Sequence, residues 1–256
     1  VFGDRSGGSP GMRLQTFCEE SYEFHTLIDP IATFCYQPMP DQPVIKIVPG
    51  KPERFLAVAP TIRAVGESFD VKFKGEDKWG NPSDKCDHQF TLRANHQVSG
   101  LPEKVTLAAG HFAGVIPGLQ VHEPADFAIE FLDDTGSVVF TTNPIRIEES
   151  PTSRHFWGDL HGQSEETIGT GTAEAYFKFA RDHAFVDIIG HQGNDFQITT
   201  AFWKHLDDLC AAFNEDGKFI AIPGYEWSGN TGLGGDRNIY FPNEGRVLRR
   251  SSHALV

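Results

Sequence analysis

The sequence has no apolar run of about 18 residues or more, which a membrane-spanning helix would require. Cysteine is scarce: the chain has four, and no two are spaced as CxxC, so the spacings match no zinc ribbon. Cys18 and Cys35 could form a disulfide in an oxidising compartment, and the sequence leaves this open. We expect a reducing, cytoplasmic location, although a signal peptide already removed would leave no trace.

Positive charge is also in deficit. The chain has 22 Lys and Arg against 35 Asp and Glu, a formal net charge of −13. This argues against broad nucleic-acid binding, which needs a basic surface. It does not exclude a small anionic substrate, because a bound metal ion can invert the local field. The one basic cluster, Arg246 with Arg249 and Arg250, is either a solvated loop or a clamp for phosphate or carboxylate.

The composition along the chain predicts three segments. Residues 1–50, rich in Gly and Pro, are expected to be irregular, with a strand at 22–28, and to wrap over other parts. Residues 51–150 are expected to form an immunoglobulin-like β-sandwich, since short alternating strands such as 68–74 are separated by turns. The residues 127–131 form a further alternating strand, and the turn at 133–136 predicts a hairpin. The sandwich is expected to lack chemistry, and none of its histidines is expected to bind metal: His88, His96, His111 and His122.

Residues 151–256 follow a linker and alternate between strand and helix patterns. Helices are expected over 173–183, with Thr172 as N-cap, and over 200–214, where the apolar spacing places Cys210 in the core. The predicted strands around them are 155–160, 185–190, 218–223 and 239–241. The order β-α-β-α-β implies a parallel sheet. Because so few βα units cannot close a barrel, we expect this chain to be the front part of a longer protein, or to pair with another piece.

Three metal-competent side chains come at the ends of the predicted parallel strands. His161 follows Asp159-Leu160, His191 follows an apolar run, and Glu226 follows another with Tyr225 before it and Trp227 after it. Because the carboxyl ends of parallel strands share one edge, these side chains could converge on one divalent ion. A carboxylate between two aromatic side chains is partly desolvated, which favours a cation as its partner. Tyr225, Trp227 and Trp157 are expected to wall the site.

Further candidates lie in the loops beside these residues. Asp159 is a candidate ligand or supporting residue, Gln163 a weak ligand, and Asp195 a hydrogen-bond acceptor or helix cap; we group these three as candidate catalytic residues. Glu165 and Glu166 are either solvated loop charges or an extra ligand or base. His253 is the last candidate metal ligand.

These motifs resemble the PHP (polymerase and histidinol phosphatase) superfamily. The segments Asp159–Ser164, Gly190-His191 and Gly224–Glu226 are similar to its first three motifs, within a bacterial family in which a β-sandwich precedes a PHP-like barrel. The resemblance implies a distorted TIM-type (β/α)7 barrel that binds two or three Mn, Zn or Fe ions. It also implies that His161, His191 and Glu226 are metal ligands, with His253 as the later histidine. Two positions depart from the pattern: Gln163 replaces a histidine and Gly190 replaces an aspartate.

The sequence therefore predicts a multi-domain chain, an immunoglobulin-like sandwich followed by the first part of an α/β barrel, over 151–256. The expected function is that of a metal-dependent hydrolase, which attacks a phosphate ester or similar anionic substrate through a metal-activated water. Two alternatives stay open: a carbohydrate-active metalloenzyme, hydrolase or lyase, or a non-catalytic binding protein with a degenerate metal site. The expected partner is a small-molecule or oligosaccharide substrate, and a homo-oligomer is also possible.

Overall fold

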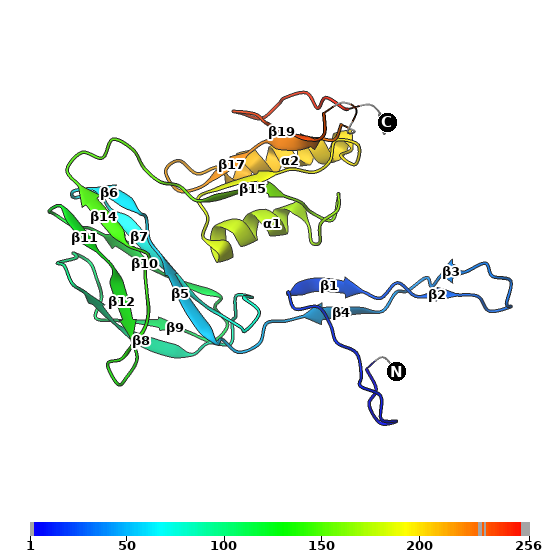
Figure 1. The fold of residues 1–256 in the computed structure, drawn as a ribbon, viewed down its shortest axis with the longest axis horizontal. Coiled ribbons are helices and arrows are strands. Elements are labelled where there is room, and N and C mark those ends of the chain that lie inside the picture. Colours follow the sequence, from blue (N-terminus) through cyan, green and yellow to red (C-terminus); the bar gives the residue numbers. More distant parts are fainter. Residues whose placement is uncertain (1–2, 230–231, 233, 252–256) are drawn as a thin grey trace.

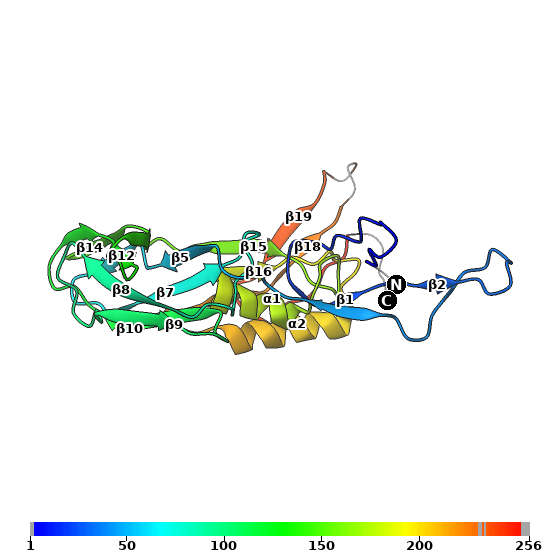
Figure 2. The same ribbon diagram turned by 90° about the horizontal axis from the view of Figure 1, so that it is seen from below.

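The computed structural model describes residues 3–229, 232 and 234–251. It contains an extended arm, a β-sandwich and an α/β part, and it is mostly β-sheet (Figure 1). The sandwich and the arm lie toward opposite ends of the long axis (Figures 1 and 2). All four cysteines are free.

The arm, residues 19–47, is a two-stranded ribbon. It consists of β1 (Glu19–Glu23), β2 (Leu27–Ile28), β3 (Gln37–Pro38) and β4 (Val44–Ile47). β1 pairs antiparallel with β4, and β2 pairs antiparallel with β3. The sequence predicts a strand at 22–28, but Thr26 interrupts it, because its N–H donates to Oε1 of Gln42 at 2.6 Å. The expected wrapping is wrong for the arm, where the chain pairs with itself and the ribbon projects away from the body (Figures 1 and 2). Before the arm, Thr16 and Cys18 are hydrogen-bonded to Asn81 of the sandwich.

The sandwich contains three sheets, with strand orders β10-β7-β5, β11-β14-β6 and β13-β12-β8-β9. Its strands are β5 (Arg54–Val58), β6 (Ile62–Ala64), β7 (Phe69–Glu76), β8 (His88–Ala94), β9 (Lys104–Leu107), β10 (Ala113–Leu119), β11 (Ala125–Phe127), β12 (Ile129–Leu132), β13 (Val138–Thr141) and β14 (Ile145–Glu148).

The alternating pattern correctly predicts β7, in which Phe69, Val71 and Phe73 are all buried. The predicted strand 127–131 is instead divided at Ala128, because β11 pairs with β14 in one sheet while β12 pairs with β8 in another. The expected hairpin joins β12 to β13.

Aromatic side chains hold the sheets together. Phe131 and Phe140 stack with their ring centroids 4.2 Å apart, and Phe90 meets the rings of Phe55 and Phe140 edge-on, each at 5.1 Å. Phe90 and Phe131 are fully buried. Burying an aromatic side chain of this size contributes about 1.5–3 kcal/mol, so this cluster is a main source of the sandwich's stability.

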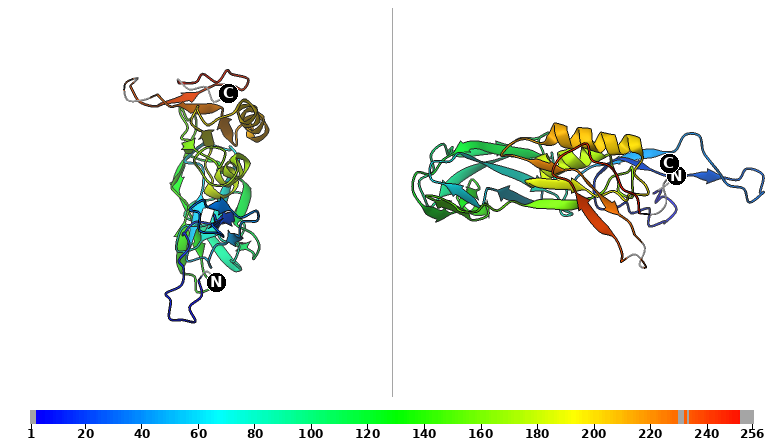
Figure 3. Two further views of the ribbon diagram at one scale, coloured as in Figure 1. Left: turned by 90° about the vertical axis from the view of Figure 1, so that its right-hand side faces the viewer. Right: turned by 90° about the horizontal axis from the view of Figure 1, so that it is seen from above.

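The α/β part begins with β15 (Gly158–Gly162), α1 (Ala173–Phe179), one π-helical turn η1 (Ala180–Ala184) and β16 (Ile188–His191). It continues with α2 (Thr200–Phe213), β17 (Ile220–Ile222), β18 (Gly224–Trp227) and β19 (Arg237–Tyr240). β15, β16 and β17 form the expected parallel sheet, and no barrel is closed by the described strands. Both helices lie on one side of this sheet, and the β18–β19 hairpin projects toward the other (Figures 2 and 3).

Local sequence signals explain the two helices. The Thr172 hydroxyl accepts a hydrogen bond from the Ala175 N–H, so it is the N-cap that the sequence predicts. The expected helix 173–183 changes to a π-turn after Phe179. α2 matches its predicted range, and Cys210 is buried there as expected.

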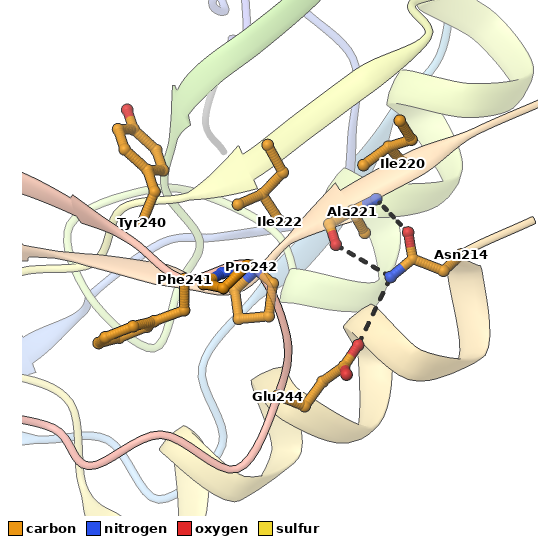
Figure 4. Close-up of a pocket in the computed structure, with 9 residues that line it drawn as sticks. Asn214, Ile220, Ala221, Ile222, Tyr240, Phe241, Pro242 and Glu244 are labelled. Carbon is orange, nitrogen blue, oxygen red and sulfur yellow. Dashed lines mark hydrogen bonds between the residues drawn. The ribbon is translucent and has the colours of Figure 1, made fainter.

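The outer edge of β17 is covered by a side chain instead of another strand. The Asn214 amide accepts a hydrogen bond from the Ala221 N–H at 2.9 Å and donates to the Ala221 carbonyl at 3.1 Å. Figure 4 shows this pair beside Pro242 and Glu244, which line the adjacent groove. Satisfying these backbone groups is one way in which an edge strand is protected from pairing elsewhere.

A buried lysine joins the sandwich to the α/β part. Lys74 of β7 donates to the His183 carbonyl at 2.5 Å and pairs with Glu76 at 2.9 Å, while the side chains of both are less than 10% exposed. The carbonyl groups at the end of η1 need donors, because the helix leaves them unpaired. Lys72 reaches the Arg181 carbonyl at 3.4 Å, a weaker contact.

We predict that Lys74→Met lowers the free energy of unfolding by about 2–3 kcal/mol, because buried Glu76 then keeps only Arg54 as an ion-pair partner among the described residues. Lys72→Met, the matched control on the same strand, should cost less than about 1 kcal/mol. Urea unfolding measures both values, and equal losses would contradict the importance of the buried contact.

Candidate functional site

His161 lies in a β-bulge of β15. Asp159 faces Ile189 and Gly162 faces His191, so β15 has one residue more than β16 between these two pairs. An extra residue of this kind re-aims the side chain that follows it. The Leu160 carbonyl accepts a hydrogen bond from the Tyr240 hydroxyl at 2.8 Å. His161 therefore lies inside the strand, whereas the sequence analysis places it just past the strand end.

Glu226 is held by the backbone of the loop that follows β16. Its N–H donates to the Gly193 carbonyl at 2.9 Å, and its own carbonyl accepts from the Asp195 N–H at 2.9 Å. Its strand, β18, pairs on the other side with β19, with Glu226 opposite Asn238. The sequence predicts a loop residue here, but the structure places Glu226 in the middle of a three-way backbone pairing.

These two constraints bring His161 and Glu226 together. His161 Nε2 lies 3.2 Å from Glu226 Oε2. The glutamate side chain is 11% exposed and the histidine side chain 50%, so a buried carboxylate faces an imidazole that reaches solvent. This pair can share a proton or bind a cation.

His191 is close in the sheet but is engaged elsewhere. Its Nδ1 accepts from the Gly193 N–H at 3.2 Å, which assigns the proton to Nε2, and Nε2 then donates to the Ser164 hydroxyl at 2.8 Å. Burial lowers the pKa of His191 to about 4, although the Glu166 carboxylate acts in the opposite direction. The ring is therefore neutral, and both of its nitrogens have partners.

The three candidate catalytic residues have supporting contacts. Asp159 accepts from the His161 N–H at 3.0 Å and so fixes the bulge. Gln163 accepts from the Thr167 hydroxyl at 2.8 Å and donates to Asn194 at 3.3 Å. Asp195 is fully buried. His253 lies outside the described residues.

Asp195 connects the loop after β16, at the rim of the parallel sheet, to the end of the described chain. Its carboxylate accepts from the Ser228 N–H at 3.2 Å and from the Ser251 N–H, and its carbonyl accepts from Arg250. This is the acceptor role that the sequence analysis considers for Asp195, and its helix-cap alternative is wrong. The N-cap of α2 is Thr199, whose hydroxyl accepts from the Phe202 N–H.

The expected aromatic wall is wrong. Trp157 precedes β15, and its indole N–H points to Thr61 of the sandwich at 3.4 Å. Tyr225 packs edge-on against Trp203 in the core, so it lies on the face of β18 opposite Glu226. Trp227 shares that face with Tyr225.

Two tyrosines that the sequence analysis does not single out take this place. Tyr240 shares a face with Glu226 through its pairing with Gly224. Tyr176 packs over Gly162, where a Cβ atom would come within 2.0 Å of its ring, so no larger residue fits. Their signal in the sequence is weak: Tyr240 lies in the predicted strand 239–241 and Tyr176 in the predicted helix 173–183, but neither belongs to a known motif.

The donors present suit a divalent ion only in part. Imidazole nitrogen and carboxylate oxygen are the ligands that Zn, Mn and Fe take, and 3.2 Å is a normal separation for two atoms that each lie about 2.1 Å from one ion. Glu166 adds a buried carboxylate oxygen without a hydrogen-bond partner among the described residues. Within that part of the chain, however, no group of three or more His, Cys, Asp or Glu side chains could hold one ion.

We predict that His191 makes stability fall as the pH drops from about 6.5 toward 4. The unfolded histidine has its ordinary pKa of 6.5 and the folded one about 4, so the unfolded state binds more protons in this interval. The full loss is on the order of 3 kcal/mol. His191→Gln should reduce this slope in urea unfolding, leaving the parts from His183, whose pKa burial also lowers, and from carboxylates of lowered pKa such as Glu67 and Asp77. The exposed His111→Gln is the control, and a slope unchanged by His191→Gln would contradict the assignment.

Comparison with known proteins places the site in a family. Residues 117–253 match the family model described as "Protein of unknown function (DUF3604)". The matched region begins in β10 and includes His161, His191, Glu226 and His253. No helix in the described ranges is long and apolar enough to cross a membrane.

Relatives and solved structures extend this comparison. An uncharacterized protein of Chlamydia pneumoniae is 24% identical over 91% of this chain and 38% of its own length. One from Chlamydia trachomatis serovar D is 25% identical over 86% of this chain and 36% of its own length. The chain thus spans little more than a third of these relatives.

Among solved structures, the D0-D1 domain of Intimin has a TM-score of 0.28 and 11% identity, over 43% of this chain and 56% of that chain. The fibronectin type-III domain of human fibronectin type III domain containing protein 3 has a TM-score of 0.18 and 15% identity, over 41% and 94%. Because the family model covers more than half of the chain, the protein belongs to the DUF3604 family.

Proposed function

We propose that this chain carries part of the active centre of a metal-dependent hydrolase of PHP type. The observation that carries the proposal is the contact of 3.2 Å between His161 Nε2 and Glu226 Oε2 at the rim of the parallel sheet. The proposed substrate class, a phosphate ester or similar anion, rests on the similarity of the Asp159–Ser164 segment to the first PHP motif.

The burial of Glu226 favours a cation at this position. Among the described residues, its carboxylate has His161 as its one side-chain partner. Burying a carboxylate that has so few polar partners costs free energy, and either a proton or a bound cation lowers that cost. A divalent ion bound here would supply a water molecule of lowered pKa as nucleophile.

The surrounding residues position the pair. Asp159 and Tyr240 fix the bulge that presents His161, and the Gly193 carbonyl fixes the backbone of Glu226. In this proposal Asp159, Gln163 and Asp195 support the site instead of touching the substrate. Pre-organisation of this kind matters because ligands must be held within a fraction of an ångström.

A second and a third ion, as in PHP proteins, would need more ligands than this pair. His191 would become a ligand in this proposal only if its proton moved from Nε2 to Nδ1, which would give up the Ser164 contact and the bond that Nδ1 accepts from the Gly193 N–H. The charge of the Glu166 carboxylate acts on this ring. His253 would add a further imidazole.

A non-catalytic binding protein is the competing candidate, and one observation favours it. Both ring nitrogens of His191 are hydrogen-bonded, and Gln163, where PHP proteins have histidine, is bonded to Thr167 and Asn194. In a degenerate metal site, the former ligand side chains would form hydrogen bonds to other protein groups in this way. Metal binding separates the two candidates.

We predict that the 256-residue chain binds Mn²⁺ or Zn²⁺, and that His161→Ala and Glu226→Gln each weaken binding at least about 100-fold, because each removes a direct ligand. Gln163→Ala should change the metal affinity less than about threefold, since the Gln163 side-chain amide is hydrogen-bonded to Thr167 and Asn194. Gln163→His should tighten metal binding by supplying the imidazole that PHP proteins have at this position. Isothermal titration calorimetry and elemental analysis measure these effects, and hydrolysis of p-nitrophenyl phosphate reports activity.

Matched controls keep the test specific. His111→Ala and Glu103→Gln alter exposed residues of the sandwich that have no side-chain partner among the described residues, so neither should change the affinity. Full metal content in both His161→Ala and Glu226→Gln would show that the pair is not a metal site. Bound metal without hydrolysis of phosphoesters would leave the oligosaccharide alternative as the next substrate class to assay.

A further inference from the structure

The arm lacks support from the rest of the described chain. Its four strands pair only with one another, and its base is tied to the sandwich where the Cys18 N–H donates to Asn81. An isolated two-stranded ribbon is at best marginally stable in water. The arm therefore has the character of an element that another surface covers.

The tip of the arm exposes large apolar side chains. The exposed fractions are 56% for Leu27, 77% for Ile31, 86% for Phe34 and 60% for Tyr36. Single exposed apolar residues are ordinary, but a cluster on one projection marks an interaction site.

The tip is also held in a defined shape. The Asp29 carboxylate accepts from the N–H and hydroxyl of Thr33, at 3.0 and 3.2 Å, and from the Phe34 N–H at 2.6 Å. Ala32 and Phe34 have positive φ values of 54° and 60°, which such residues rarely adopt. Backbone held in this way fits a loop that is shaped in advance for binding.

The arm is acidic as well as apolar. Residues 19–47 contain five Asp and Glu and a single Lys. That lysine, Lys46, is already paired with Glu20 at 2.6 Å. A surface that covers the arm should therefore combine apolar and basic groups.

The face of the β18–β19 hairpin that carries Tyr225 and Trp227 has this composition where a groove opens beside the core. A groove of about 720 Å³ lies between the hairpin and residues 245–249. It is lined by the apolar residues Trp227, Ile239 and Phe241 and by the arginines Arg237, Arg246 and Arg249. Because side chains alternate along a strand, this groove lies on the face of β18 opposite Glu226. It is thus separate from the His161–Glu226 pair.

The arginines of the groove lack acidic partners. Among the described residues, none of the three forms an ion pair, whereas the arginines of the sandwich, such as Arg93 and Arg146, pair with carboxylates at 2.6–2.8 Å. In a chain with a net charge of −13, three unpaired arginines beside aromatic rings are notable. Arginine and aromatic residues together are typical of protein interfaces.

We propose that the arm of one copy docks in this groove on a second copy of the chain, and that the second arm docks reciprocally. The acidic, apolar arm and the basic, apolar groove are complementary in both respects. The arm projects away from its own body and does not lie beside the β18–β19 hairpin of the same chain (Figures 1 and 2). Reciprocal docking of two such surfaces gives a closed two-fold dimer. This inference does not depend on the proposed hydrolase activity.

Sedimentation velocity and light scattering on the 256-residue chain test the proposal. We expect a concentration-dependent dimer that weakens as salt rises from about 0.1 to 1 M, because salt screens the charged contacts. Phe34→Asp should raise the dissociation constant at least ~30-fold, as should the double variant Arg246→Glu with Arg249→Glu. An equimolar mixture of these two variants should again form dimers, since it retains one intact arm and one intact groove.

Two controls guard against indirect effects. Val115→Asp and Lys104→Glu make matched changes at exposed positions of the sandwich, and both should leave the dimer intact. Circular dichroism should show unchanged folding for Phe34→Asp, because that side chain is 86% exposed. A chain that stays monomeric at all concentrations overturns the proposal, and so does a dimer that survives Phe34→Asp or a variant mixture that does not associate.

Discussion

The backbone pairing between β18 and the loop after β16 is the constraint on which the rest of the site depends. The bonds from Glu226 to Gly193 and from Asp195 to Glu226 fix the register of β18 beside the parallel sheet. Because side chains alternate along a strand, this register turns the Glu226 carboxylate toward His161 and turns Tyr225 and Trp227 the other way. One pair of backbone bonds thereby defines two chemically different faces.

A layer of buried polar side chains lies beside that backbone pairing and supports its register. Ser164, His191, Gln192, Asn194 and Asp195 are all less than 10% exposed, next to an otherwise apolar core. Groups of this kind cost free energy unless each finds a partner, and a partly satisfied network costs more than an apolar core of equal volume. His191 and Asp195 are satisfied through Ser164, Gly193, Ser228 and Ser251. The Glu166 and Gln192 side chains each keep one buried oxygen that has no partner among the described residues. The sheet rim is therefore one place where this fold gives up stability, as functional sites commonly do.

The sequence predicts the regular elements better than the site. Thr172 and the apolar spacing of α2 are local signals, so both helices and the parallel order could be derived from them. The bulge at Leu160–His161 could not, because it arises from the register against β16 and not from any residue of β15. The sequence does not predict the β18–β19 hairpin, because Pro223 and the glycine-rich stretch between its strands are typical of loops. The partners of His191 depend on how the loop from Ser164 folds back, which is a tertiary contact that no spacing encodes.

The two faces of β18 also connect the proposed metal site with the proposed dimer contact. Trp227 and Arg237, opposite each other in the hairpin, line the arginine groove, while Glu226 next to Trp227 meets His161. Tyr225 packs on Trp203 in the core, whereas Trp227 and Arg237 line the open groove, so a twist of the hairpin at the groove would move Glu226 relative to the bulge. In the two proposals, a second copy docked in the groove would restrict that motion, and the Glu226 carboxylate would then be held closer to the geometry that a metal ion requires. In these two proposals, occupation of the groove and metal affinity at the His161–Glu226 pair would be linked through one strand, and such a coupling changes both affinities by the same factor.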